Sequence, residues 1–266
     1  MNSSYSVGKN KRLFELTEFP AINPGDKVII LFSGGIKSTL AALIAKELYG
    51  IENIVFGFIS IDAFGDFKNN TERLKISKKN HNDAFERLGG IHKFELGNND
   101  FTKNRSMHQL HSKKILNAFP SVKYSIAGYN KIHEETMEML IESGWGKGFI
   151  TKSNLSSYVE SNSNKYETLN YALKNFNLPI PFTNSDVEFN ELHKSFYSMV
   201  RPFRNLNDAE IIQLYNKMNL LNNLYQTKSC EILENDHCGN CRNCLERKDA
   251  FLQAKITDLT NYSFNS

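Results

Sequence analysis

The sequence has no apolar run as long as a membrane-spanning helix needs, which is about 20 residues. Its first residues also lack the apolar core of a secretion signal. The net charge is only +3, which gives no reason to expect a nucleic-acid or membrane partner. Apolar and charged residues make up 40% and 23% of the chain, and these ordinary values argue against wholesale disorder. We therefore expect a folded cytoplasmic protein with one good core and at most a small second lobe.

Cysteine is scarce, and all four cysteines fall within 15 residues near the C-terminus. They are Cys230, Cys238, Cys241 and Cys244. Disulfides are rare in a reducing compartment, so this cluster indicates a metal site. The two-residue spacers let a tight turn aim successive sulfurs at one point, and four thiolates at tetrahedral corners suit a structural zinc. An iron–sulfur cluster and a set in which His237 replaces one cysteine are the alternatives. A zinc with four protein ligands would support folding rather than chemistry.

The stretch 28–48 reads as a buried strand, a glycine turn and the start of a helix. The continuous apolar run 28–32 suits a strand that is buried on both faces. Apolar residues at helical spacing resume after Ser38 or Thr39. A glycine turn at a helix N-terminus presents backbone N–H groups to an anion. The ligand that this geometry favours is a phosphate.

Three interpretations compete for this loop. A Walker loop needs a glycine at the position of Ile36, directly before the lysine, and a second glycine at a fixed position upstream, and neither is present. An ordinary β–α turn without a ligand is the second. The third, which we favour, is the Ser-Gly-Gly-x-Asp-Ser loop of the PP-loop family, the ATP pyrophosphatases. Residues 33–38 resemble that loop, with Lys37 at the position of the aspartate.

Further along the chain, strand-like and helix-like segments alternate. Strands are expected at 54–61, 91–96, 124–128 and 199–203, and helices at 71–88, 106–118, 134–142, 188–197 and 207–219. Such alternation predicts a parallel sheet with its nucleotide site at the carboxyl ends of the strands. We divide the chain into an N-terminal extension (1–26), an α/β nucleotide-binding domain (27–205) and a C-terminal helical region with the cysteine cluster (206–266).

Two motifs resemble the same family, the 7-cyano-7-deazaguanine synthases, which are also PP-loop proteins. One is the loop at 33–38. The other is a C-G-x-C-x-x-C-x-x-R-x-x-A-F run, here residues 238–251, which follows a cysteine after a Thr/Ser step. The resemblance implies a doubly wound parallel sheet of the PP-loop (adenine nucleotide alpha-hydrolase-like) type, with a C-terminal helical zinc-binding region. Members of the family commonly pair, so a homodimer is a further expectation.

The resemblance also implies a chemistry. The family activates the carboxylate of 7-carboxy-7-deazaguanine with ATP, replaces AMP with ammonia, and dehydrates the amide to a nitrile in a second activation. It therefore implies a carbon–nitrogen ligase of queuosine biosynthesis that uses ATP, magnesium and zinc. In similar proteins of bacterial antiphage defence the product is a conjugate, so a protein amine is an alternative acceptor.

The resemblance and the loop geometry together assign roles to individual residues. The backbone amides and side chains expected to hold the nucleotide and its phosphates are those of Ser33, Gly34, Gly35, Ser38 and Thr39. Asp62 matches a strand-ending aspartate of the family, which would contact nucleotide or metal. Gly128, at the end of a predicted strand, would allow close approach to adenine or substrate.

Lys37 is the departure from the family pattern with the largest consequence. A lysine cannot ligate magnesium as an aspartate can, but it could supply positive charge directly to the phosphates. We therefore treat Lys37 and Ser38 as the catalytic candidates. The alternative is a protein that binds nucleotide without cleaving it and acts through a partner.

Overall fold

The structure, a computed structural model, describes residues 4–61, 70–99, 114–128, 198–230 and 232–263. Contacts within the chain divide it into two compact units. The described residues of unit 1 are 4–16, 203–230 and 232–263, and those of unit 2 lie within 17–128 and 198–202. The domain boundaries at 27 and 206 remain predictions.

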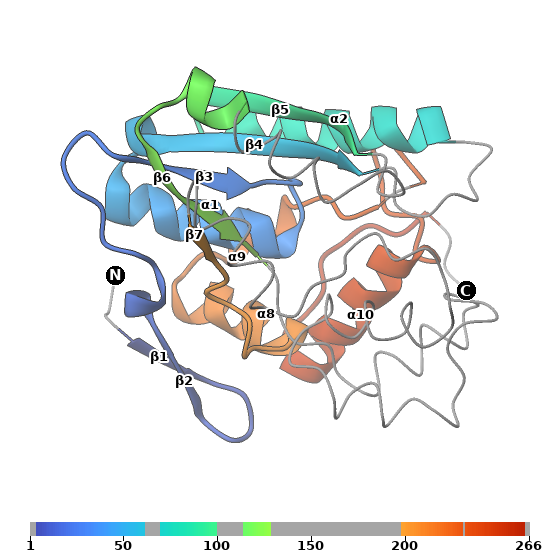
Figure 1. Cartoon of the computed structure of the whole chain (residues 1–266). Helices are drawn as coiled ribbons and strands as arrows, with labels where there is room; N and C mark the ends of the chain where they lie inside the picture. Colours follow the sequence, from blue (N-terminus) through green and yellow to red (C-terminus); the bar gives the residue numbers. More distant parts are fainter. Residues whose placement is uncertain (1–3, 62–69, 100–113, 129–197, 231, 264–266) are drawn as a thin grey trace, which may run out of the picture. The chain divides into compact units, whose positions relative to one another are not determined.

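Unit 2 is built on a five-stranded sheet in which every neighbouring pair is parallel. Its strands are β3 (Lys27–Leu31), β4 (Ile54–Ile61), β5 (His92–Asn99), β6 (Val122–Ala127) and β7 (Ser198–Val200). The order is β5-β4-β3-β6-β7, with the first strand of the unit in the centre (Figure 1). The chain adds strands on one side and then on the other, which confirms the predicted doubly wound α/β sheet.

Helices cover both faces of this sheet. They are α1 (Ile36–Tyr49), α2 (Asn70–Arg87) and a helical turn at 114–118, and a short 3₁₀ helix η2 (Ile51–Asn53) precedes β4. The ring of Phe85 on α2 packs edge-on against Phe56 of β4, with ring centroids 5.3 Å apart. Ile115 packs instead in a cluster with Val55. Successive residues of a strand point to opposite faces, so α2 and the 114–118 turn lie on opposite sides of β4. The central strand is accordingly a continuous apolar run.

The ends of the two long helices agree with the sequence signals, with one shift. The predicted stop of α2 is confirmed, because the N–H of Gly90 donates to the carbonyl of Phe85 at 2.9 Å. The ammonium of Lys46 on α1 donates to the carbonyl of Leu88 just beyond α2, at 2.8 Å. Helix α1 begins at Ile36, two or three residues before the predicted start at Ser38 or Thr39. Gly35 in an extended conformation is its N-cap, and its carbonyl accepts the first helical hydrogen bond from Thr39.

Unit 1 combines an N-terminal hairpin with C-terminal helices. The hairpin pairs β1 (Ser4–Val7) with β2 (Arg12–Glu15) in antiparallel register, and a 3₁₀ helix η1 (Leu16–Glu18) follows. The ring of Phe14 packs on Phe203 at 5.6 Å. The N–H of Gly8 donates to the amide oxygen of Gln213 at 2.7 Å. The sequence did not predict this hairpin.

The helices of unit 1 are α8 (Asp208–Lys217), α9 (Leu221–Tyr225) and α10 (Arg242–Ala254). The predicted start of α8 is confirmed by a reciprocal capping box between Asn207 and Glu210. The helices predicted at 134–142 and 188–197, and most of the one at 106–118, lie outside the described residues. Among the residues that the structure describes, no helix combines the length and apolarity needed to cross a bilayer.

Candidate functional site

The loop at the carboxyl end of β3 is closed by its two serines. The Ser33 N–H donates to the Ser38 hydroxyl oxygen at 3.2 Å, and the two hydroxyl oxygens lie 3.0 Å apart. The N–H of Gly35 donates to the Ser33 hydroxyl at 3.4 Å, and the Ser38 hydroxyl donates back to the Gly35 carbonyl at 3.3 Å. The structure therefore brings the predicted serines and Gly35 together in one hydrogen-bonded turn.

Two glycines of the predicted site are required by backbone packing. Gly34 has a φ of +78°, and a Cβ atom there would lie 2.7 Å from the carbonyl oxygen of Asn80 on α2. A Cβ atom on Gly128 would lie 2.9 Å from the carbonyl carbon of Lys37. Gly128 thus approaches the backbone of the first turn of α1. Its predicted approach to adenine or substrate stays a prediction.

The first turn of α1 has the electrostatic character of an anion site. Its N-cap, Gly35, has no side chain, and the first turn contains no acidic residue. Lys37 lies within this turn and is half-buried. A helix N-terminus carries unpaired backbone donors and the positive end of the helix dipole. The loop and this turn together suit a phosphate, as the sequence predicted.

Thr39 and Asp62 are the two remaining residues predicted to contact the nucleotide. Thr39 is fully buried, and its hydroxyl has no hydrogen-bond partner among the described residues. Asp62 lies outside the described residues, directly after the end of β4. The nucleotide contacts predicted for both residues stay predictions.

His81 on α2 is a residue of this site that sequence reasoning missed. It is fully buried, and its Nδ1 lies 3.1 Å from the carbonyl oxygen of Phe32, the residue before the loop. Its ring lies against those of Phe32 and Phe58, at 5.3 and 4.7 Å between centroids. Burial lowers the pKa of His81 to about 4, so the ring is neutral near pH 7. A carbonyl oxygen can only accept, so Nδ1 carries the proton.

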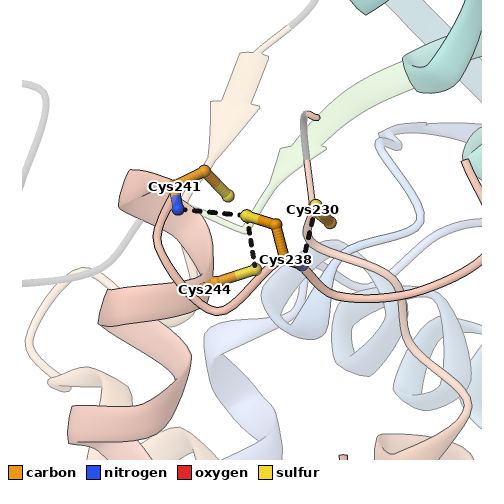
Figure 2. Close-up of side chains that lie close together, drawn as sticks. All are labelled: Cys230, Cys238, Cys241 and Cys244. Carbon is orange, nitrogen blue, oxygen red and sulfur yellow. Dashed lines mark hydrogen bonds between the residues drawn. The ribbon is translucent and has the colours of Figure 1, made fainter. Parts of the chain in front are cut away.

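The four cysteines converge in unit 1 (Figure 2). Cys230 precedes a loop that contains Cys238, while Cys241 is the N-cap of α10 and Cys244 lies in its first turn. Their sulfur atoms all lie within 4.8 Å of one another, and all four residues are buried. Zinc–sulfur bonds of about 2.3 Å place tetrahedral sulfurs about 3.8 Å apart. The observed Cys238–Cys244 separation of 3.9 Å fits that value.

Backbone N–H groups surround the sulfurs as they do in a tight metal-binding turn. The N–H groups of Leu233 and Cys238 donate to the Cys230 sulfur at 3.3 and 3.4 Å, and that of Cys241 donates to the Cys238 sulfur at 3.2 Å. Hydrogen bonds from the neighbouring thiols of Cys241 and Cys244 hold the pKa of Cys230 well below its usual range, while the bonds that Cys244 shares with Cys230 and Cys241 raise its own pKa. Four buried sulfurs that converge on one point, with backbone amides that stabilise thiolates around them, suit a zinc ion.

His237 is not a member of this ligand group. Its Nε2 accepts the Ser229 N–H at 3.3 Å, and its ring packs edge-on against Tyr262 at 5.9 Å. Burial lowers its pKa to about 4. The structure thus gathers the four cysteines without the histidine that the sequence left as an alternative.

Arg247 ties α10 to the segment that leads into the cluster. It is 1% exposed, and its Nη1 donates to the hydroxyl oxygen of Thr227 at 2.8 Å. Its Nε donates to the hydroxyl oxygen of Thr260 at 2.7 Å, and the guanidinium lies 5.2 Å from the centre of the Phe251 ring. Burial lowers the pKa of Arg247 from its ordinary value. All of these contacts lie within unit 1, so they give Arg247 a structural role.

Known proteins of similar sequence give evidence that is independent of the geometry of the site. The model of a family described as queuosine biosynthesis protein QueC matches residues 162–255. A 7-cyano-7-deazaguanine synthase of Methanococcus maripaludis is 28% identical over 253 residues, which is 89% of this chain and 98% of the relative. A synthase of Methanosphaera stadtmanae is 24% identical over 248 residues, with the same two coverages.

Among solved structures, the U34-tRNA thiolase NcsA from Methanococcus maripaludis with its [4Fe-4S] cluster matches at 17% identity. The match covers 98% of this chain and 80% of that one, with a TM-score of 0.36, a likeness too weak to carry a conclusion. The family resemblance read from the two motifs is confirmed by the sequence relatives, which extend it over most of the chain. The chain is therefore a distant homologue of the QueC family of 7-cyano-7-deazaguanine synthases, PP-loop proteins to which it is related at about 25% identity.

Proposed function

We propose that this protein uses ATP to activate the carboxylate of a 7-carboxy-7-deazaguanine-like acid and transfers the acyl group to an amine. One observation carries the proposal. A serine–glycine loop that suits a phosphate and a four-cysteine cluster occur in one chain, in the order of the family that the two motifs resemble. Either motif alone would leave many functions open, whereas the pair in this order favours one family of reactions.

The reaction has two balanced steps. In the first, a carboxylate oxygen attacks the α-phosphorus of ATP, the bond to the β-phosphate oxygen breaks, and pyrophosphate leaves. In the second, the amine attacks the acyl carbon, the bond to AMP breaks, and the amine loses a proton as the amide forms. A carboxylate is a poor electrophile, and the mixed anhydride with AMP supplies the leaving group that it lacks. The acceptor is ammonia in the synthase reaction and a protein amine in the alternative.

The described residues would contribute mainly by positioning phosphates and neutralising their charge. The loop amide of Gly34 would face the phosphate oxygens, with the Ser38 hydroxyl beside it. The amide of Gly35 would join them by exchanging its 3.4 Å bond to the Ser33 hydroxyl for one to phosphate. Lys37 would add a positive charge at the same place, where an aspartate would hold magnesium instead. The four cysteines would hold a zinc ion that supports folding and leaves no coordination position open for chemistry.

The test is AMP formation from ATP by the zinc-loaded protein, with and without 7-carboxy-7-deazaguanine. AMP and pyrophosphate that appear only with the acid would support adenylation. Mass spectrometry of the products would then separate the free amide or nitrile from a protein conjugate. ATP binding without AMP would refute the proposal for this acid.

A second candidate function is nucleotide binding without turnover, and Lys37 is the observation that favours it. The two candidates give opposite expectations for Lys37→Asp. If the lysine replaced a needed magnesium ligand, the substitution raises AMP formation. If the lysine itself neutralises phosphate charge, the same substitution lowers both ATP affinity and AMP formation. Lys46→Asp is not a suitable control, because it would remove the bond from Lys46 to the carbonyl of Leu88. Lys75→Asp, at an exposed position of α2, makes the same change of charge and serves instead.

A further inference from the structure

A single peptide group, between Phe32 and Ser33, joins β3 to the loop. Its carbonyl oxygen accepts from Nδ1 of His81 at 3.1 Å, and its N–H donates to the Ser38 hydroxyl at 3.2 Å. The preceding N–H, that of Phe32, donates to the carbonyl of Gly57 on β4 at 2.8 Å. The plane of this peptide is thus fixed from both sides at the point where the chain leaves the sheet.

Helix α2 provides the support on one of these sides. Besides the bond from His81, the carbonyl of Asn80 and the methyl group of Ala84 face Gly34, at 2.7 and 3.1 Å from where a Cβ atom would be. The ring of His81 is itself held between aromatic neighbours and is fully buried. A rigid helix therefore contacts two successive parts of the loop, the peptide at 32–33 and the backbone of Gly34.

We propose that His81 is a positioning residue for the loop: its Nδ1–H holds the Phe32 carbonyl and thereby fixes the direction in which the following loop amides point. The inference deepens the proposed function, because it is the nucleotide phosphates that those amides would bind. His81 touches no reacting atom in this assignment. Its effect passes through the orientation of the peptide at 32–33 and of Gly34 and Gly35.

The chemistry of the donor explains why histidine suits this position. A buried carbonyl without a donor is costly, so the peptide would rotate to find another partner if the donor were lost. Rotation of a peptide plane redirects the amides that follow it, and phosphate binding depends on amides that already point inward. The neutral ring supplies one donor at a fixed place without placing a charge inside the core.

Three variants of the full, zinc-loaded chain separate this role from simple packing. His81→Phe keeps an aromatic ring and removes the donor. His81→Asn places an amide N–H close to the position of Nδ1. Phe85→Leu removes ring contacts of the same helix, among them the stacking on the His81 ring at 6.4 Å between centroids, and keeps the donor to the Phe32 carbonyl. It is therefore the matched control for loss of packing around His81 and α2 without loss of the hydrogen bond.

The readouts are ATP affinity by isothermal titration calorimetry and hydrogen exchange of the peptide that spans 32–39. We expect His81→Phe to weaken ATP binding by about tenfold, equivalent to about 1.4 kcal/mol, and to speed exchange in the loop. His81→Asn should restore affinity to within about threefold of wild type. Phe85→Leu should lower the melting temperature while the affinity and the loop exchange stay as in wild type.

Each remaining outcome decides the question. Wild-type affinity and loop exchange in His81→Phe would overturn the inference, as would failure of His81→Asn to rescue either readout. Equal effects of Phe85→Leu and His81→Phe would assign His81 to packing alone. If the wild-type protein binds no ATP, the proposed function fails, and loop exchange in the three variants still decides the role of His81.

Discussion

Substitution of Arg247 tests whether its guanidinium stabilises the region that contains the four cysteines. Arg247→Met keeps a long apolar stem and removes the planar group. The carbonyl of Leu224 loses the 3.3 Å bond from Nη2 of Arg247 but keeps two other donors, the N–H and the hydroxyl of Thr227, at 3.0 and 2.6 Å. The carbonyl of Thr227 has only its 3.4 Å bond from Arg247 among the described residues.

The expected magnitude follows from these losses. One buried carbonyl left without a donor costs about 2 kcal/mol. Loss of the cation over the Phe251 ring adds about 1 kcal/mol. We therefore expect Arg247→Met to lower the free energy of unfolding by about 3 kcal/mol. Arg247→Lys should be no better, because an ammonium on a shorter stem cannot reach Thr227 and Thr260 together.

Urea unfolding followed by circular dichroism gives the stability, and transfer of zinc to a coloured chelator gives the rate of metal release. Thr227 lies three residues before Cys230, so both arginine variants should release zinc several-fold faster. Lys248→Met is the matched control, because this neighbouring cation lies over an aromatic ring, that of Tyr262 at 4.5 Å, without being fully buried. If Arg247→Lys matches the wild type in both assays, the planar guanidinium is not what holds Thr227 and Thr260, and the prediction is refuted.

Three further predictions concern pH, metal and backbone. Because His81 titrates near 4 in the fold and near 6.5 when exposed, the unfolded chain binds the extra proton, and stability falls as the pH drops from 6.5 to 4, by up to about 3 kcal/mol. His81→Phe should lack this part of the acid unfolding curve, and an unchanged curve would contradict the assignment. Cys244→Ser should reduce the zinc content measured by mass spectrometry and expose unit 1 to proteolysis, whereas retention of a full equivalent of zinc would refute the four-cysteine site. Gly34→Ala should lower the melting temperature and the ATP affinity far more than Gly25→Ala. Both glycines have a φ near +80°, but only at Gly34 would the new Cβ atom lie within 3 Å of a backbone carbonyl oxygen. Equal effects of the two substitutions would show that this close contact does not matter.

The parts of the fold that the sequence predicted are those whose signals are local. Strand β3 is buried on both faces, so its residues form a continuous apolar run that needs no partner to be recognised. The cap at Asn207 and the spacing of the four cysteines are also complete within a few residues. Such features depend on nearby chain alone, and each was placed within one or two residues.

Other parts depend on residues far away in the sequence. Residues 4–15 form a hairpin whose buried face is short, and its partner is α8, about 200 residues later. His81 was missed for a related reason. It lies seven residues after Leu74 and four before Phe85, so it falls on the apolar stripe of α2, a position that is unusual for a polar residue. That periodicity was a usable signal for burial, but its bond to Phe32 could not be read from it.

The hairpin of unit 1 has a consequence for synthesis on the ribosome. The buried ring of Phe14 packs on Phe203, and the N–H of Gly8 donates to Gln213. The hairpin can therefore make these contacts only after residues 203–213 have emerged from the ribosome. At translation rates of about 5–20 residues per second, the nascent N-terminus waits roughly 10–40 s for its partner. During that interval Phe14 is available to chaperones, and slow codons before position 213 would prolong its exposure.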